Sequence, residues 1–189
     1  MNEEIKSALI RVLPFVATML FLLIATKRKK INTSDLGIEK PVSKNNFFIW
    51  TAGFLALILL TEFSLYKIGI LEIEKWDHSL YPSIIRILGA VILAPIAEEL
   101  IFRGLILNRL WQKGINMHLA IAIQACFFVL LHSFTYENTF SSNIGIIQTF
   151  VDASLFGYAR YQTKSIYTPI TMHITGNLIA TLERFIFFV

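Results

Sequence analysis

A small set of acids, imidazoles and amides lies within stretches of the sequence that are otherwise apolar. The members that could take part in chemistry are Glu98, Glu99, Arg103, His132, His173 and Asn177. A charged side chain in hydrocarbon costs about 2.5–3.5 kcal/mol on insertion scales. Each one is therefore expected to be compensated by a polar partner or to serve a function. A carboxylate and an imidazole around one cavity can activate water for attack on a carbonyl carbon, while further donors stabilise the oxyanion. The set therefore favours hydrolysis of a peptide bond within a membrane.

The first pattern contains two adjacent acids. Glu99 and Arg103 are four residues apart, so they share one face of a helix and can form an ion pair. Glu98 is rotated from Glu99 by about 100° and has no basic residue three or four positions away. Pro95 removes an amide donor one turn earlier, which leaves polar backbone near Glu98. A purely architectural role is an equal alternative for the ion pair, but it does not explain Glu98.

Two further pairs repeat the four-residue spacing, Phe128 with His132 and His173 with Asn177. Each pair lies on one helix face. Taken alone, His132 is more often a hydrogen-bonded packing residue than a catalytic one, and His173 with Asn177 could equally form a hydrogen bond between helices. The depth of these residues in the membrane helps to choose between a structural and a functional role. Counted at about 1.5 Å per residue from the expected cytosolic edges, Glu98, His132 and His173 lie roughly 18, 21 and 12 Å deep. These depths agree within about two helical turns, so we expect the three groups to share a cavity.

Other polar residues leave more than one interpretation open. Gln148 and Asp152 form another pair at four-residue spacing. Asp152 could orient one of the histidines, since a carboxylate commonly holds an imidazole, or it could be solvated in a water-filled cavity. His78 and His118 lie in or beside loops, and we expect no role for either.

Other designs of intramembrane protease fit the sequence less well. It has no His-Glu-x-x-His motif, and Ser154 lacks the Gly-x-Ser-x-Gly surroundings of a serine nucleophile. Asp152 is the only aspartate within an expected span, so an aspartyl dyad has no second member. A zinc ion held by Glu98, His132 and His173 stays open, because two histidines and one glutamate bind catalytic zinc elsewhere.

The elements that carry these residues are expected to be membrane helices. Of the 189 residues, 55% are hydrophobic and 16% are charged, against roughly 25% charged in soluble domains. This excludes an ordinary soluble domain and a disordered chain, and the single cysteine, Cys126, excludes an intrachain disulfide. A span needs about 20 mostly apolar residues. The candidate spans are about 7–26, 47–66, 84–110, 118–134, 144–159 and 165 to near the C-terminus.

Basic residues in the loops predict the orientation of the chain. They concentrate after the first, third and fifth spans, and most of them lie between residues 27 and 44. The positive-inside rule then puts these loops in the cytosol and both termini outside. Arg11 lies near the outer end of the first span. The same loops account for the net charge of +4, so we expect no nucleic-acid partner.

Three motifs occur in one order on three spans. They are Glu98-Glu99-x-x-x-Arg103, Phe128-x-x-x-His132 and His173-x-x-x-Asn177. In this order they resemble the CPBP family, the CAAX-protease and bacteriocin-processing intramembrane endopeptidases, which is also called the Abi family. The resemblance covers about residues 82–181. It implies a helical core with a cavity that is open to the membrane and the cytosol.

The resemblance also implies a role for each matching residue. Glu98 would activate water with His132 as its partner, and His173 and Asn177 would form the oxyanion site. We expect supporting roles for Glu99, Arg103, Phe128 and Asp152. A metal-free mechanism is the preferred interpretation, and a zinc ion on Glu98, His132 and His173 is the alternative.

These inferences combine into one expectation for the whole chain. We predict an all-α, polytopic transmembrane bundle of about six spans, with a polar cavity between the last four. Residues 1–82 would form amino-terminal spans and a basic loop, and residues 83–189 the catalytic core. The function would be an intramembrane peptidase in the bacterial plasma membrane, acting on a membrane protein or on a membrane-associated, CAAX-like or bacteriocin-like peptide. The alternatives are a non-catalytic membrane-binding or bacteriocin self-immunity protein on the same scaffold and a proton-coupled transporter.

Overall fold

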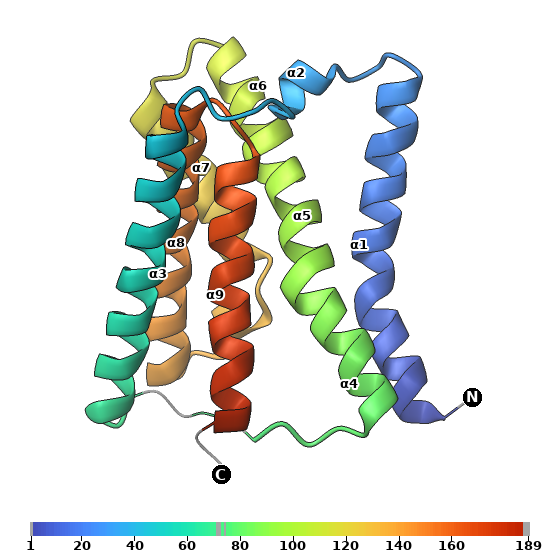
Figure 1. Cartoon of the computed structure of the whole chain (residues 1–189), viewed down its shortest axis with the longest axis vertical. Helices are drawn as coiled ribbons and strands as arrows, with labels where there is room; N and C mark the ends of the chain where they lie inside the picture. Colours follow the sequence, from blue (N-terminus) through green and yellow to red (C-terminus); the bar gives the residue numbers. More distant parts are fainter. Residues whose placement is uncertain (1, 71–72, 74, 187–189) are drawn as a thin grey trace.

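The computed structural model describes residues 2–70, 73 and 75–186, and all regular structure within this part is helical. Most helices run along one common direction, with both termini at the same end of the molecule, the lower end in Figure 1. The basic segment after the first helix lies at the opposite end. Outside the third expected span, the helices are α1 (Glu3–Lys27), α2 (Thr33–Leu36), α3 (Lys44–Lys67), α7 (Met117–Leu130), α8 (Phe140–Thr163) and α9 (Tyr167–Ile186).

The third expected span, which we call the central rod, is a single helical path with two wider turns in it. In order it comprises α4 (Leu80–Ile87), a π-helical segment η1 (Leu88–Leu93), α5 (Ala94–Glu99), a second π-helical segment η2 (Leu100–Ile106) and α6 (Leu107–Gln112). In the first wide turn the Ala94 N–H donates to the Gly89 carbonyl, five residues earlier. Pro95 follows directly, and its missing N–H breaks the regular ladder at this point. Such π-helical turns are often found at functional sites.

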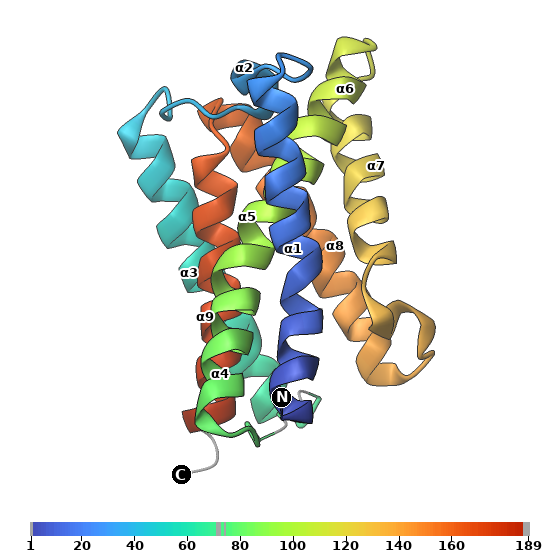
Figure 2. The same ribbon diagram turned by 90° about the vertical axis from the view of Figure 1, so that its right-hand side faces the viewer.

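Packing between the helices is uneven. Figure 2 shows α1 lying along α4 and α5, and these are its main contacts. The helices α7, α8 and α9 pack on one another in chain order, and α3 closes against α9 and α8. Buried Phe54, Phe156 and Met172 join α3, α8 and α9, while Phe102 and Phe128 join η2 to α7. The core therefore lies around α8 and α9, with α1 at the periphery.

Large apolar side chains cover much of the outer surface. Those on α1 that are exposed include Ile10, Leu13, Leu20, Phe21, Leu23 and Ile24. By length and composition, α1 and α3 are the two described helices that could each cross a membrane. A soluble monomer rarely exposes apolar surface on this scale, so these faces suit contact with lipid.

The basic segment between α1 and α3 is tied to the rest of the bundle. Its Gly37 carbonyl accepts the Ile166 N–H, and its Val42 N–H donates to the Thr163 carbonyl. Leu36 is buried against Gly104, where an added Cβ would lie only 3.2 Å from the Leu36 carbonyl oxygen. These contacts fix the segment to η2 and to the junction of α8 and α9.

Candidate active site

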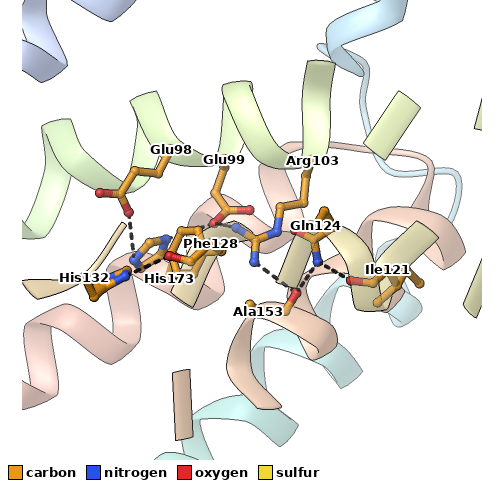
Figure 3. Close-up of polar contacts among 9 residues, drawn as sticks. All are labelled: Glu98, Glu99, Arg103, Ile121, Gln124, Phe128, His132, Ala153 and His173. Carbon is orange, nitrogen blue, oxygen red and sulfur yellow. Dashed lines mark hydrogen bonds and ion pairs between the residues drawn. The ribbon is translucent and has the colours of Figure 1, made fainter. Parts of the chain in front are cut away.

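A buried ion pair forms the centre of the candidate site (Figure 3). Glu99 on α5 accepts a hydrogen bond from Arg103 Nη1 at 2.7 Å, which is the contact that their four-residue spacing indicated. The same carboxylate oxygen, Oε1, lies 2.9 Å from Nδ1 of His173 on α9. Glu99 and Arg103 are fully buried. One carboxylate therefore holds two cationic or polar groups from two different helices.

The guanidinium of Arg103 is held on several sides. Its Nη2 donates to the Ala153 carbonyl at 2.9 Å, and Gln124 Nε2 donates to the same oxygen at 3.0 Å. The guanidinium carbon also lies 4.6 Å from the ring centre of Phe128 and 5.2 Å from that of Phe156. Cation–π contacts of this kind stabilise a desolvated charge. Arg103 thus joins η2 to α7 and α8.

Glu98 lies on the other side of His173. Its Oε2 is 3.7 Å from Nε2 of the imidazole, so His173 lies between two carboxylates. The Glu98 side chain keeps 23% of its surface exposed, whereas that of Glu99 has none. Phe156 stacks on His173, with 5.2 Å between ring centres and 27° between planes. Of the two acids, Glu98 is the one that water can reach.

His132 lies just beyond the end of α7. Its Nδ1 is 2.9 Å from the Phe128 carbonyl oxygen, so Nδ1 carries the proton that is donated there and Nε2 carries the lone pair of the neutral ring. The Phe128 ring contacts both imidazoles, with 5.0 Å to the His132 centre and 5.8 Å to that of His173. Glu98 has an ion-pair contact with His173, and the partnership of Glu98 with His132 that the resemblance implies stays a prediction.

Asn177 follows His173 by one turn of α9 and reaches across to the central rod. Its Nδ2 donates to the Ala90 carbonyl at 2.8 Å. In the π-helical register of this turn the N–H of residue 95 would bond to Ala90, but Pro95 has none. The amide of Asn177 satisfies the carbonyl that proline leaves without a partner. This is the polar backbone that Pro95 led us to expect near Glu98.

Asp152 lies on α8, next to Ala153, whose carbonyl accepts from Arg103. In the described part of the chain it has no ion pair with His173. It lines a smaller pocket of about 290 Å³ together with Gln148, whose amide donates to Glu62 of α3. Sequence reasoning missed Glu62, although an acid inside the second apolar stretch is a signal of its own.

A cavity of about 910 Å³ adjoins the site. His132 and Asn177 line it, together with Ala90 and Ala94 of the central rod. The α1 residues Val12 and Phe15, among others, also contribute to its wall, whereas the sequence placed the cavity between the last four spans. His78, for which we expected no role, lies in this wall too. Gln124, which the four-residue spacing places on the same helix face as Phe128 and His132, is a further member of the site, although the sequence assigned it no role.

A zinc ion on Glu98, His132 and His173 stays the alternative to a metal-free site. Within residues 2–70, 73 and 75–186, no three His, Cys, Asp or Glu side chains are grouped so that they could hold one. The two nitrogens of His173 face the two glutamates, and Nδ1 of His132 bonds to a backbone carbonyl. Glu98 and His173 form an acid–imidazole pair in this arrangement.

Comparisons with known proteins agree with the residue pattern. Residues 80–179 match the family described as Type II CAAX prenyl endopeptidase Rce1-like. The range includes every candidate site residue from Glu98 to Asn177. An Escherichia coli protein described as an uncharacterized 24.3 kDa protein is 27% identical over 140 residues, which cover 70% of this chain. The chain spans 62% of the length of that relative. No solved structure matches the chain.

Proposed function

The chain belongs to the Rce1-like family of type II CAAX prenyl endopeptidases, and on this premise we propose that it hydrolyses peptide bonds within the membrane. Family membership and the apolar faces of α1 and α3 indicate an integral membrane protein of the CAAX-protease type. The proposed substrate is a membrane protein or a membrane-associated peptide of CAAX or bacteriocin type. The proposal includes six membrane spans, with the rod from α4 to α6 counted as one, and the bacterial plasma membrane as location.

One observation carries the proposal: Glu98 is the accessible member of two adjacent acids and lies against an oriented imidazole. The buried Glu99–Arg103 pair fixes Nδ1 of His173, and this leaves Nε2 turned toward Glu98. A carboxylate that holds an imidazole in one tautomer is a recurring device of hydrolytic sites. The arrangement thus supports Glu98 as the reactive acid and Glu99 as its support.

The proposed reaction starts from a water molecule beside Glu98. Glu98 takes a proton from the water, whose oxygen forms a bond to the peptide carbonyl carbon. The carbonyl double-bond electrons move to oxygen, giving a tetrahedral oxyanion. His132 accepts a hydrogen bond from the attacking water through Nε2. The second N–H of Asn177 and the protonated Nε2 of His173 are the proposed donors to the oxyanion.

Collapse of this intermediate completes the reaction. The bond from carbon to nitrogen breaks, and the proton held by Glu98 passes to the leaving nitrogen. One water is consumed, and the products are a carboxylic acid and an amine. Neither half-reaction requires an oxidant, a nucleotide or a covalent enzyme intermediate.

The decisive experiment replaces the proposed reactive acid. Purified Glu98→Gln protein should lose peptide cleavage by at least about 100-fold, because general acid–base catalysis contributes that much or more. The matched control is Glu137→Gln on an exposed loop, which should keep full activity. Cleavage is measured with quenched fluorescent peptides and by comparing membrane peptidomes of cells that carry each variant. Unchanged cleavage by Glu98→Gln protein, or a cellular effect that survives it, would favour the non-catalytic binding or immunity role.

We also propose that the reaction needs no metal ion. Elemental analysis of the purified protein should find less than stoichiometric zinc, and cleavage should persist after dialysis against a strong chelator. Zinc at one ion per chain that is lost together with activity, and restored with it, would contradict this part of the proposal. That result would return Glu98, His132 and His173 to the role of ligands.

A further inference from the structure

Four basic residues in a row lie at the end of α1, at the end of the bundle opposite both termini (Figure 1). All four are exposed, and they are Lys27, Arg28, Lys29 and Lys30. The Lys30 N–H donates to the Ala25 carbonyl and Lys29 has a φ of 53°, so the chain turns back directly after the helix. This turn gathers the four cationic side chains around one helix end. We call residues 27–30 the basic turn.

No acid neutralises the basic turn in the part of the chain that the structure describes. None of its four side chains takes part in an ion pair there. Asp35 is the next acid along the chain, but one of its carboxylate oxygens accepts from Asn108 and Gln112 of α6. The other oxygen accepts from Asn32 at 3.3 Å. The charge of the basic turn is therefore available to an anion from outside the chain.

The same end of α1 presents an apolar face below the basic turn. Four large side chains each keep half or more of their surface exposed, namely Leu20, Phe21, Leu23 and Ile24. The main contacts of α1 are with α4, η1 and α5, and they leave this face open. Because α1 is long enough to cross the hydrocarbon core, its end lies at the level of the lipid headgroups. Acyl chains and headgroups would thus meet neighbouring parts of one helix.

We propose that residues 20–30 form a docking site for anionic phospholipids. The basic turn binds the headgroup phosphate, and the apolar face of α1 contacts the acyl chains. Clusters of four or more Lys or Arg directly beyond a membrane helix attract anionic lipid headgroups. A soluble phosphate would contact the basic turn alone, so the apolar face favours a lipid as the source of the anion. This site lies apart from the candidate active site and does not depend on peptide hydrolysis.

Native mass spectrometry of the full chain in detergent micelles measures lipid binding directly. The probes are phosphatidylglycerol and phosphatidylcholine with identical acyl chains, each added over the same concentration range. We expect the first phosphatidylglycerol to bind about ten-fold more tightly than the first phosphatidylcholine, since one basic residue near a headgroup contributes up to about five-fold.

Substitution of the basic turn locates the preference. A variant that combines Lys27→Gln, Arg28→Gln, Lys29→Gln and Lys30→Gln should reduce the preference for phosphatidylglycerol to about two-fold or less. The matched control removes four other exposed cations from the same end of the bundle and should keep the preference. It combines Lys40→Gln, Lys44→Gln, Arg109→Gln and Lys113→Gln. Thermal unfolding of each variant shows that it is folded. If the fourfold variant is not, a triple variant that keeps Lys29 decides the question.

Several outcomes would overturn the docking site. Equal binding of the two lipids by the unsubstituted chain would do so, as would a preference that survives substitution of the basic turn. An equal loss of preference in the control variant would show that net charge alone attracts the lipid. Glycerol 3-phosphate is the soluble probe. If it displaces phosphatidylglycerol at equal concentration, the ligand is a free phosphate and the proposal fails.

Discussion

At the scale of single residues, two adjacent glutamates have opposite surroundings. Successive side chains on a helix differ in direction by about 100°, so Glu98 and Glu99 point to different neighbours. Glu99 is fully buried against Arg103 and His173, while Glu98 keeps part of its surface open. The first can only support structure or orientation, and the second can exchange protons with water. This difference in surroundings supports the proposed roles of Glu98 as the reactive acid and Glu99 as its support.

Local spacing predicts the partner of Glu99 but does not report the contact of Glu98 with His173. The spacing of Glu99 and Arg103 along one helix was sufficient to predict their contact. The partner of Glu98 depends on the tilt and rotation of α9 against α5, which no local pattern reports. The contact of Glu98 with His173 therefore comes from the structure alone, and the partnership of Glu98 with His132 stays a prediction.

Arg103 should be essential for stability. Arg103→Ala removes one member of a buried pair and leaves the Glu99 carboxylate without its strongest partner. We expect a loss of about 3–5 kcal/mol in the free energy of unfolding, measured by denaturant titration in detergent micelles. Lys6→Ala, which breaks the exposed pair with Glu3, should cost at most about 1 kcal/mol. Similar costs for the two substitutions would show that the buried pair does not stabilise the fold.

At the scale of elements, the central rod owes its shape to Pro95. The wide turn before it and the missing N–H leave the Ala90 carbonyl without a partner from its own helix. Asn177 supplies that partner from α9, so one hydrogen bond fixes the separation of two helices at the candidate site. An amide that serves the backbone in this way is held in one orientation, as an oxyanion donor must be.

A double-mutant cycle tests this link. Asn177→Leu should destabilise the protein by about 0.5–1.5 kcal/mol, because it removes the hydrogen bond to the Ala90 carbonyl. Pro95→Ala restores an N–H at position 95, so the same substitution should cost less in that background. The measurement is the free energy of unfolding of the four proteins, and the coupling between the two sites is expected to be nonzero. Strict additivity would show that Asn177 and the proline act independently.

The sequence predicted which helices exist better than where they end. The apolar run that suggested a span to residue 134 stops being an α-helix at Leu130, and a short 3₁₀ turn, Ser133–Tyr136, follows. Thr135 Oγ1 donates to the Val129 carbonyl and thereby closes the last turn of α7. A hydropathy profile does not detect this hydrogen bond. The early end matters because it leaves His132 in the turn, at the edge of the cavity.

At the scale of the whole molecule, the bundle has two chemically different ends. Both termini lie at one end, and the basic segment after α1 lies at the other (Figure 1). The cavity extends toward the end with the termini, through Trp76, His78 and Arg184. Its wall combines α1 with helices that are more than sixty residues away in the chain. No sequence pattern connects such distant residues, so the contribution of α1 could not be predicted.

We predict the orientation of the chain in the membrane from the distribution of charge. In a Cys126→Ser background, Glu137→Cys should react with a membrane-impermeant maleimide added to intact cells, because its loop is predicted to face outward. Lys30→Cys, in the basic segment, should react only after the cells are permeabilised. Both positions are exposed, so a difference in labelling reports the side of the membrane. The reverse pattern would show that the termini face the cytosol.

Trp76 gives the cavity a built-in optical reporter. Its indole lies in the cavity wall, stacks on Phe185 with 5.5 Å between ring centres and donates to Ser83 Oγ at 2.7 Å. The other two tryptophans, Trp50 and Trp111, are outside the described cavity lining. We expect their emission to change less when the cavity is filled. A change in intrinsic fluorescence therefore signals filling of the chamber, without any dye attached to the protein.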